Sequence, residues 1–194
     1  MTKQIDTDRI LVRSKTLMMG YFKEPARTAE VLDEQGFLHT GDVGEIDQEG
    51  FLRLTGRVKD IFKTSRGRYV VPAPIEQALM DLPEVDEACV VGQDLPQPLA
   101  LVRLGDGQYE RADVVRRALA EALERLNATL ASSERLGCVV VVDTLWDVDG
   151  GFRTPTHKLR RNVVEATWQA HFHDWLVSGQ SVVWHQSEQR QETT

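Results

Sequence analysis

The chain has 194 residues, a formal net charge of −7, and 41% hydrophobic and 27% charged residues. This length suits one domain or two small ones, and the apolar content is too high for wholesale disorder. The acidic balance argues against a nucleic-acid partner, because such binding depends on clustered positive charge. No apolar run approaches a membrane span, and residues 1–6 lack the apolar stretch of a secretory signal. We therefore expect a soluble, cytoplasmic protein.

The first part of the chain is predicted to contain a helix and a hairpin. Pro25 is predicted to open a helix over 26–32, since a proline is tolerated in the first helical turn, and Gly36 is predicted to end it. Apolar residues on both sides of an acidic turn that ends in glycine indicate a β-hairpin. The predicted strands of this part lie at 10–13, 43–46 and 51–54.

The remainder of the chain mixes helices and short strands without strict alternation. Helical spacing of apolar residues predicts helices over 74–82, 112–130 and 159–176. Strands are predicted over 88–91, 100–104 and 137–142. Val182 to Trp184 either adds a short strand or packs against the last helix, and the polar residues 186–194 are predicted to fray. This pattern favours an α+β fold.

Two cysteines and several histidines bear on redox and metal chemistry. Cys89 and Cys138 lie in apolar, strand-like surroundings, so that a disulfide and two buried thiols both fit the sequence; we favour the thiols. His171 and His173 are two residues apart on a predicted helix and therefore point to different faces. We expect no metal site.

Three clusters hold residues suited to chemistry. In His39-Thr40-Gly41-Asp42 a carboxylate beside a glycine suits a vicinal diol such as that of a ribose, although these residues alone favour a tight turn. The stretch from Arg57 to Arg68 holds five cations opposed only by Asp60, which suits phosphate contacts or a solvated hairpin. In Thr154 to Arg161, Lys158 lies where a loop meets a helix and could meet an anionic group or simply water.

Taken in order, these clusters resemble the C-terminal part of the adenylate-forming enzymes, the superfamily of acyl-CoA synthetases, amino-acid adenylation domains and luciferases. Tyr21 to Asp42 is similar to the motif GYxxxPxxT…GWxxTGD, with Phe37 at the usual tryptophan position. Gly56 to Glu76 is similar to the hinge motif GRxKDxxKxxxGxxVxPxxIE, and Thr154 to Lys158 is similar to the C-terminal lysine motif, which often has Ser-Gly before the lysine. The sequences D-I-F-K-T-S (60–65) and T-P-T (154–156) most resemble those of long-chain fatty acyl-CoA synthetases.

The resemblance implies the fold of the family's small C-terminal domain, a short mixed sheet flanked by helices and preceded by a β-hairpin hinge region. Residues 1–56 would be the last β-rich part of the large N-terminal adenylation domain. Residues 57–178 would be the mobile domain, with its hinge near Lys59, and 179–194 a partly disordered tail.

The same resemblance implies a role for each matching residue. Asp42 would bind the ribose hydroxyls of the nucleotide, assisted by Arg57, and Lys59 would lie at the hinge between two working orientations. In the first orientation Lys158 would stabilise charge while acyl-AMP and pyrophosphate form. In the second, a loop would open a route for the CoA thiol. This loop contains Lys63, Ser65, Arg66 and Gly67.

The implied reaction joins a fatty acid or other carboxylate to CoA with ATP and Mg²⁺. The family's phosphate loop, magnesium-binding glutamate and acyl pocket precede the matching region, so we expect the chain alone to be inactive and to bind none of these cofactors tightly. Its partner would be the missing N-terminal domain, whose absence would expose apolar surface and favour self-association. The parent enzyme would be cytoplasmic or peripheral to a membrane. The alternative is a naturally short, non-catalytic module that docks on a partner or supplies the small domain in trans.

Overall fold

The computed structural model describes residues 2–6 and 9–185 and divides the chain into two compact units, Met1–Ile61 and Phe62–Thr194. The division falls five residues after the domain boundary expected at Gly56. Among the residues that the structure describes, no helix is long and apolar enough to cross a membrane.

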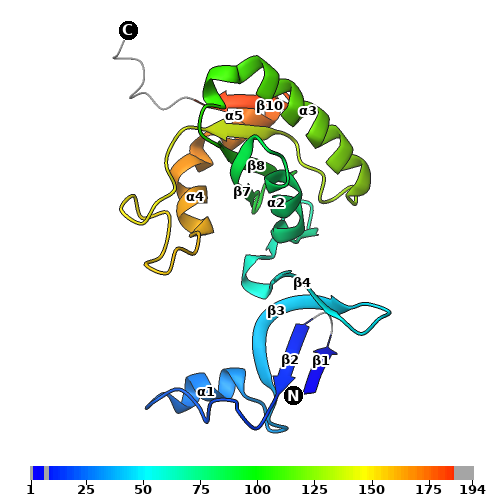
Figure 1. Ribbon diagram of the computed structural model, residues 1–194, viewed down its shortest axis with the longest axis vertical. Helices are drawn as coiled ribbons and strands as arrows, with labels where there is room; N and C mark the ends of the chain where they lie inside the picture. The colour runs from blue at the N-terminus through cyan, green and yellow to red at the C-terminus, as the bar shows by residue number, and fades with distance from the viewer. Residues whose placement is uncertain (1, 7–8, 186–194) are drawn as a thin grey trace. The chain divides into compact units, whose positions relative to one another are not determined.

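The first unit is a four-stranded antiparallel sheet in the order β1-β2-β3-β4, with one short helix (Figure 1). Helix α1, Pro25–Val31, begins at its proline as predicted. The strands are β1 (Thr2–Asp6), β2 (Arg9–Arg13), β3 (Leu38–Ile46) and β4 (Leu52–Arg57), and a 3-10 turn η1 (Val58–Asp60) follows. The β3–β4 pairing confirms the predicted hairpin. Among the residues of this unit whose burial is described, from Arg9 onward, the buried apolar side chains are Ile10, Leu11, Phe37 and Val43.

The prediction that Gly36 ends α1 is wrong, because the helix stops at Val31 and Gly36 serves a separate turn. The Gly36 amide donates to the Asp33 carbonyl at 3.0 Å, and Gly36 takes a φ of +77°, which glycine adopts without strain. The Asp33 carboxylate accepts the Phe37 amide at 2.9 Å, and this bond is the main cause that lowers the pKa of Asp33. The same Asp-x-x-Gly-Phe turn recurs at Asp47 between β3 and β4.

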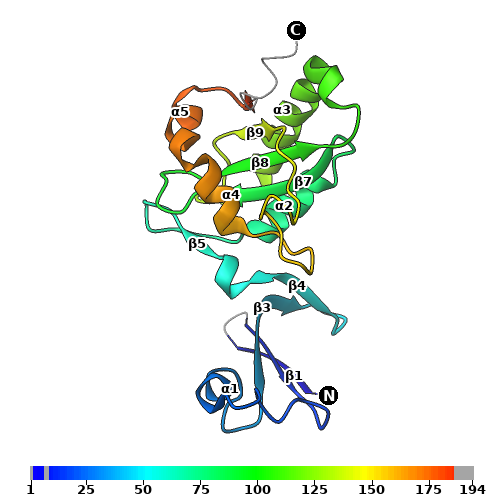
Figure 2. The same ribbon diagram turned by 90° about the vertical axis from the view of Figure 1, so that its left-hand side faces the viewer.

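The second unit is a mixed four-stranded sheet with helices on both faces (Figure 2). Its order is β10-β9-β8-β7, in which β7 and β8 are antiparallel and the other two pairs are parallel. The sheet strands are β7 (Val85–Val91), β8 (Leu99–Leu104), β9 (Val139–Val142) and β10 (Val182–His185). The helices and remaining strands are β5 (Phe62–Lys63), β6 (Tyr69–Val70), α2 (Pro72–Met80), η2 (Tyr109–Arg111), α3 (Ala112–Thr129), α4 (Arg161–Trp168), η3 (Gln169–His171) and α5 (Phe172–Val177). The predicted short mixed sheet flanked by helices is confirmed.

Both faces of this sheet carry apolar side chains. Successive side chains of a strand point to opposite faces, and these strands contain runs of consecutive apolar residues. In β9, Val139 and Val141 pack with α2 and α3, whereas Val140 and Val142 pack with the aromatic side chains of α4 and α5. Cys89 and Cys138 belong to the second of these cores as buried thiols that form no disulfide with each other. Burial raises the pKa of Cys138 to about 11, so this thiol stays protonated and unreactive at neutral pH.

The predicted single helix over 159–176 is wrong in its extent and continuity. Leu159 instead forms a β-bridge with Arg153, so α4 begins only at Arg161. A 3-10 turn then separates α4 from α5 at Gln169–His171, where the winding tightens to three residues per turn. The aromatic side chains of this segment are nevertheless buried as a helical face would bury them: Trp168, Phe172 and Trp175.

Strand β10 settles the alternative left open for Val182 to Trp184, because it pairs in parallel with β9. Three rings connect β10 to the preceding helices. The His171 and His185 ring centroids lie 4.9 Å apart, and Trp175 lies 5.5 Å from His171 and 5.2 Å from His185. The described part of the expected tail is therefore ordered into the sheet, whereas the predicted fraying of residues 186–194 lies outside the described residues.

Truncation of the long helix tests the first core. Leu119→Ala removes a fully buried side chain of α3 and is expected to lower the free energy of unfolding by about 2–5 kcal/mol. Trp146, Trp168, Trp175 and Trp184 all lie in the second unit, so tryptophan fluorescence in a urea titration reports on that unit alone. Val114→Ala on the exposed side of the same helix is the control, with an expected change within about 0.5 kcal/mol. Equal effects of the two substitutions would contradict the assigned helix face.

The histidine pair predicts a loss of stability in mild acid. Burial lowers the pKa of His185, and the nearby His171 lowers it further, against an opposing effect of Asp143. As the pH falls below about 6.5, the unfolded chain therefore takes up a proton at His185 before the folded chain does, and the folded state loses stability. Urea titrations between pH 8 and 5 should show a shallower loss for His185→Phe than for the native chain. His173→Phe, at an exposed position, should leave the pH dependence unchanged; an unchanged slope in His185→Phe would refute this account.

Candidate functional site

The predicted ribose-binding residues meet across the β3–β4 pairing. Asp42 lies opposite Arg57 in the register, and the Arg57 Nε donates to the Asp42 Oδ1 at 3.0 Å. Thr40 holds the backbone of β3 next to Asp42, because its hydroxyl donates to the Ile10 carbonyl of β2 at 2.9 Å and accepts the Asp42 amide at 3.1 Å. A half-buried carboxylate therefore lies beside a cation on a sheet, where it can accept hydrogen bonds from a hydroxyl-bearing ligand.

Lys59 lies at the end of the first unit. It is an exposed residue of the 3-10 turn η1, which follows β4 directly. The two compact units divide two residues later, after Ile61. This place in the chain is compatible with the predicted hinge at Lys59.

The second cluster forms a short basic turn, Thr64 to Arg68, between β5 and β6. Thr64 is buried, and its amide donates to the Arg68 carbonyl at 2.9 Å. The Ser65 amide donates to the Leu95 carbonyl at 2.9 Å and so attaches the turn to the loop after β7. Gly67 takes a φ of +76° and closes the turn through a 2.9 Å bond to the Thr64 carbonyl. The turn and its first strand present the four predicted loop residues and Arg68 as exposed residues: Lys63, Ser65, Arg66, Gly67 and Arg68.

Lys158 lies on a second hairpin of the same unit, here called the lysine hairpin, which runs from Arg153 to Leu159. Its two ends form a β-bridge, and the Thr154 amide donates to the Lys158 carbonyl at 2.9 Å. The Thr154 hydroxyl accepts the Lys158 amide at 3.1 Å. These bonds fix the backbone of Lys158 while its side chain remains exposed.

His157 explains why the family motif often has glycine before the lysine. Its φ is +60°, a left-handed conformation that strains most side chains and that glycine adopts freely. Histidine is among the non-glycine residues enriched in this region. The departure from Ser-Gly to Thr156-His157 therefore keeps the turn geometry.

Two arginine–glutamate pairs hold the lysine hairpin at its ends, and sequence reasoning missed both. At the downstream end the Arg161 Nη1 donates to the Glu76 Oε1 at 2.5 Å and to the Val90 carbonyl at 2.6 Å. The same carboxylate oxygen accepts the Val90 amide at 2.7 Å, so α2, β7 and α4 meet at one ion pair. At the upstream end Arg153 pairs with Glu87 of β7. Glu76 was part of the quoted hinge motif, and the arginine at the start of the helix after the lysine hairpin could have been considered as its partner.

The structure thus distributes the predicted residues over both units. Asp42, Arg57 and Lys59 belong to the first unit, and the basic turn and the lysine hairpin belong to the second. Within the described ranges, no group of three or more His, Cys, Asp or Glu side chains is placed to hold a metal ion.

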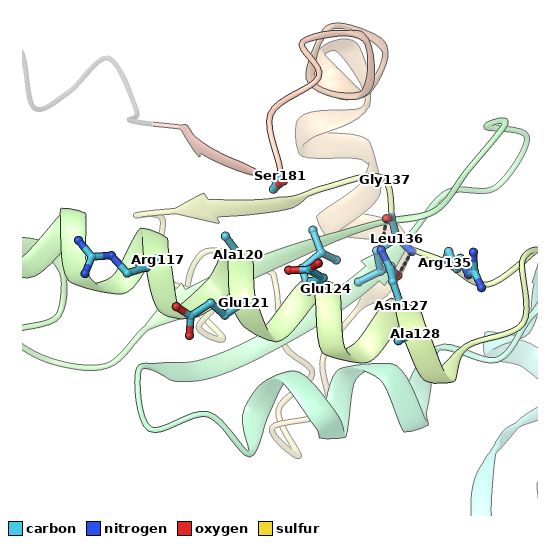
Figure 3. A pocket seen from close by; sticks show the side chains of 11 residues that line it. Arg117, Ala120, Glu121, Glu124, Asn127, Ala128, Arg135, Leu136, Gly137 and Ser181 are labelled. Carbon is cyan, nitrogen blue, oxygen red and sulfur yellow. Dashed lines mark hydrogen bonds between the residues drawn. The ribbon is translucent and has the colours of Figure 1, made fainter.

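A groove of about 690 Å³ lies along α3 and contains none of the predicted site residues (Figure 3). Arg117 and Glu121 on α3 and Ser181 before β10 are among the residues that line it. Asn127 bridges its far end, donating to the Leu136 carbonyl at 2.9 Å and accepting the Leu136 amide at 2.8 Å. We interpret the groove as the seam between α3 and the β9 and β10 segments.

A family comparison decides the relationship. The profile of the AMP-binding enzyme C-terminal domain matches residues 59–174, which is more than half of the chain. The chain belongs to this family. As an AMP-binding C-terminal domain it contains both the basic turn and the lysine hairpin within the matched residues.

Curated relatives and solved structures of this AMP-binding domain agree with that assignment. The chain is 32% identical over 171 residues to long-chain-fatty-acid–CoA ligase 1 of Homo sapiens, covering 78% of the chain and 24% of the relative. It is 33% identical over 176 residues to long-chain-fatty-acid–[acyl-carrier-protein] ligase AEE15 of Arabidopsis thaliana, covering 82% and 24%. The adenylation domain of a carboxylate reductase from Mycobacterium chelonae superposes with a TM-score of 0.72 at 26% identity, covering 89% of this chain and 28% of that one. The chain spans a quarter to a third of the length of the curated relatives it matches.

The left-handed turn at His157 predicts opposite effects of two substitutions. His157→Val places a β-branched residue at positive φ and is expected to lower the free energy of unfolding by about 1–2 kcal/mol. His157→Gly removes the strain and should be at least as stable as the native chain. Urea titrations followed by tryptophan fluorescence compare them, with His173→Val inside α5 as the control for the side-chain change. If valine were tolerated as well as glycine, the assigned turn would be wrong.

Proposed function

We propose that this chain is the C-terminal part of an ATP-dependent ligase that joins a long-chain fatty acid to CoA. The arrangement that carries the proposal is a single unit with two differently built cationic loops, the basic turn and the lysine hairpin, following a unit that contains the Asp42–Arg57 pair. The relatives named above support the acyl class, since both are named for long-chain fatty acids.

In the proposed adenylation step, Lys158 provides a positive charge at the reacting phosphate. The exposed ammonium on a bonded hairpin meets the fatty-acid carboxylate and the α-phosphate of ATP, and stabilises the charge that develops as acyl-AMP and pyrophosphate form. Because the backbone of the hairpin is held before the substrate arrives, little reorganisation is needed at the moment of reaction.

In the proposed thioester step, the second unit turns about Lys59 and presents the basic turn in place of the lysine hairpin. The exposed Lys63 and Arg66 then lie near the phosphates of CoA, and Gly67 allows backbone to approach the ligand closely. Rotation of one rigid unit supplies a different set of groups to each half-reaction.

Asp42 and Arg57 are proposed to hold the nucleotide through both steps. The Asp42 carboxylate accepts hydrogen bonds from the two ribose hydroxyls, and Arg57 remains beside it as the compensating cation. We assign Mg²⁺, the phosphate loop and the acyl pocket to the large domain that precedes this region in the family.

Removal of the proposed catalytic cation separates the two half-reactions. In an enzyme that contains this chain behind an adenylation body, Lys158→Ala is expected to reduce ATP–pyrophosphate exchange by at least about 10²-fold, the size of effect seen when one transition-state donor is removed. Conversion of supplied acyl-AMP and CoA to thioester should remain within about twofold of the native rate, because Lys158 is absent from that step.

The control for this experiment is Arg117→Ala, which removes an exposed cation from α3. It should leave both half-reactions unchanged. Intact pyrophosphate exchange in Lys158→Ala would refute the role of Lys158, and loss of both half-reactions would refute the division of labour between the two loops. Adding the chain in trans to a separate adenylation body tests the alternative of a stand-alone small domain.

A further inference from the structure

Arg153 donates to three different acceptors, one in the lysine hairpin, one in the loop after β9 and one on the sheet. Its Nε donates to the Trp146 carbonyl at 2.8 Å, and its Nη1 donates to the His157 carbonyl at 2.6 Å. Its Nη2 pairs with the Oε1 of Glu87 on β7. The His157 carbonyl belongs to the peptide group that joins His157 to Lys158, so this one guanidinium reaches the backbone directly before Lys158.

Glu87 is itself held from the other side. Its Oε2 accepts the Arg103 Nε of β8 at 2.5 Å, and the Arg103 Nη2 donates to Asp86 at 2.7 Å. Two carboxylates and two guanidinium groups therefore form a cluster without net charge, in which Glu87 is only 15% exposed. Partial burial strengthens these contacts relative to an exposed pair, and each carboxylate oxygen of Glu87 has its own arginine.

We propose that Arg153 is a positioning residue for Lys158, fixing the lysine hairpin for the adenylation step through the Glu87–Arg103 pair. This inference rests on the proposed function. The hairpin lies between β9 and α4 in the chain, and Leu159 packs against the second core. The hydrogen bonds of the hairpin residues other than Arg153 join them only to one another or to Arg153. Without Arg153, the His157 carbonyl loses its tie to the sheet, and the left-handed turn at His157 loses the contact that stabilises its strain.

The planar guanidinium matters for this role as much as its charge. The three acceptors of Arg153 are reached by three different nitrogens of one rigid fork. A lysine ammonium keeps the charge, but it is one nitrogen at the end of a flexible stem and cannot reach all three positions together. Arg153→Lys therefore distinguishes positioning from a purely electrostatic contribution.

The first test uses the full 194-residue chain without substrate. Amide exchange of His157 and Lys158, which donate to Thr154, should become several-fold faster in both Arg153→Met and Arg153→Lys. Amide exchange in β9 should change little, because Arg103 still pairs with Glu87. Arg117→Met on the exposed side of α3 is the matched control and should leave the hairpin amides unchanged. Unchanged amide exchange of His157 and Lys158 in Arg153→Met would overturn the proposal, because Arg153 would then not hold the hairpin backbone.

The second test measures the half-reactions in the enzyme that contains this chain. Arg153→Met and Arg153→Lys should both lower kcat for ATP–pyrophosphate exchange, up to the order of 10²-fold, since a displacement of about 1 Å can cost that much. The KM for ATP and the conversion of supplied acyl-AMP to thioester should stay near their native values. Full activity of Arg153→Lys would show that charge alone suffices and would overturn the positioning role.

Comparison with Lys158→Ala separates the two levels of argument. If Lys158→Ala abolishes ATP–pyrophosphate exchange and Arg153→Met does not lower it, the positioning role fails while the proposed function stands. If Lys158→Ala leaves ATP–pyrophosphate exchange intact, the proposed function fails whatever the effect of Arg153→Met. Glu87→Gln keeps the shape of the side chain but removes its charge. It should speed the amide exchange of His157 and Lys158 less than Arg153→Met does. Native rates of amide exchange in Glu87→Gln would show that Glu87 has no part in positioning the hairpin.

Discussion

The second unit depends on a sheet that must be covered on both faces. Apart from the charged side chains near one end of β7 and β8, the side chains of β7, β8 and β9 are apolar in both directions, and all four valines of β9 are fully buried. A sheet of this composition is unstable in water unless helices pack against each side. Helices α2 and α3 supply one cover and α4 and α5 the other, so every connection between them must pass around an edge or an end of the sheet. The lysine hairpin lies in one such connection, the one from β9 to α4, and the basic turn precedes α2.

Charged side chains at the margins of this core decide how the lysine hairpin is held. Breaking a partly buried ion pair by removing one partner is costly, because the remaining charge has lost its solvation. Arg161 with Glu76 and Arg153 with Glu87 each meet this constraint, and each joins the hairpin to an element far away in the sequence. These ion pairs therefore attach the backbone of the hairpin to the sheet, even though the side chain of Lys158 is exposed. This explains how a flexible side chain can be presented from a defined backbone position.

The division of the chain after Ile61 gives the two loops a common carrier. The basic turn and the lysine hairpin both belong to the second unit, and the short 3-10 turn containing Lys59 lies at the end of the first. In the proposed function, a rigid unit with two loops supplies different groups to the two half-reactions by reorientation rather than by refolding. The proposed hinge at Lys59 lies beside a β-hairpin rather than inside a long helix, in a 3-10 turn that has no buried residue.

Local sequence patterns were sufficient to predict most of the helices and strands. Apolar spacing predicted α2 and α3, the glycine turn at Asp47 predicted the β3–β4 hairpin, and motif order indicated Asp42, Arg57 and Lys158. These features depend on residues close together in the chain, or on motif spacing. Only the tertiary structure decided three other features: the start of α4 at Arg161, the parallel pairing of β10 with β9, and the ion pairs of Arg153 with Glu87 and of Arg161 with Glu76. Each of these depends on partners tens of residues away, and a charged residue beside a loop looks the same in sequence whether water or a carboxylate from a distant strand satisfies it.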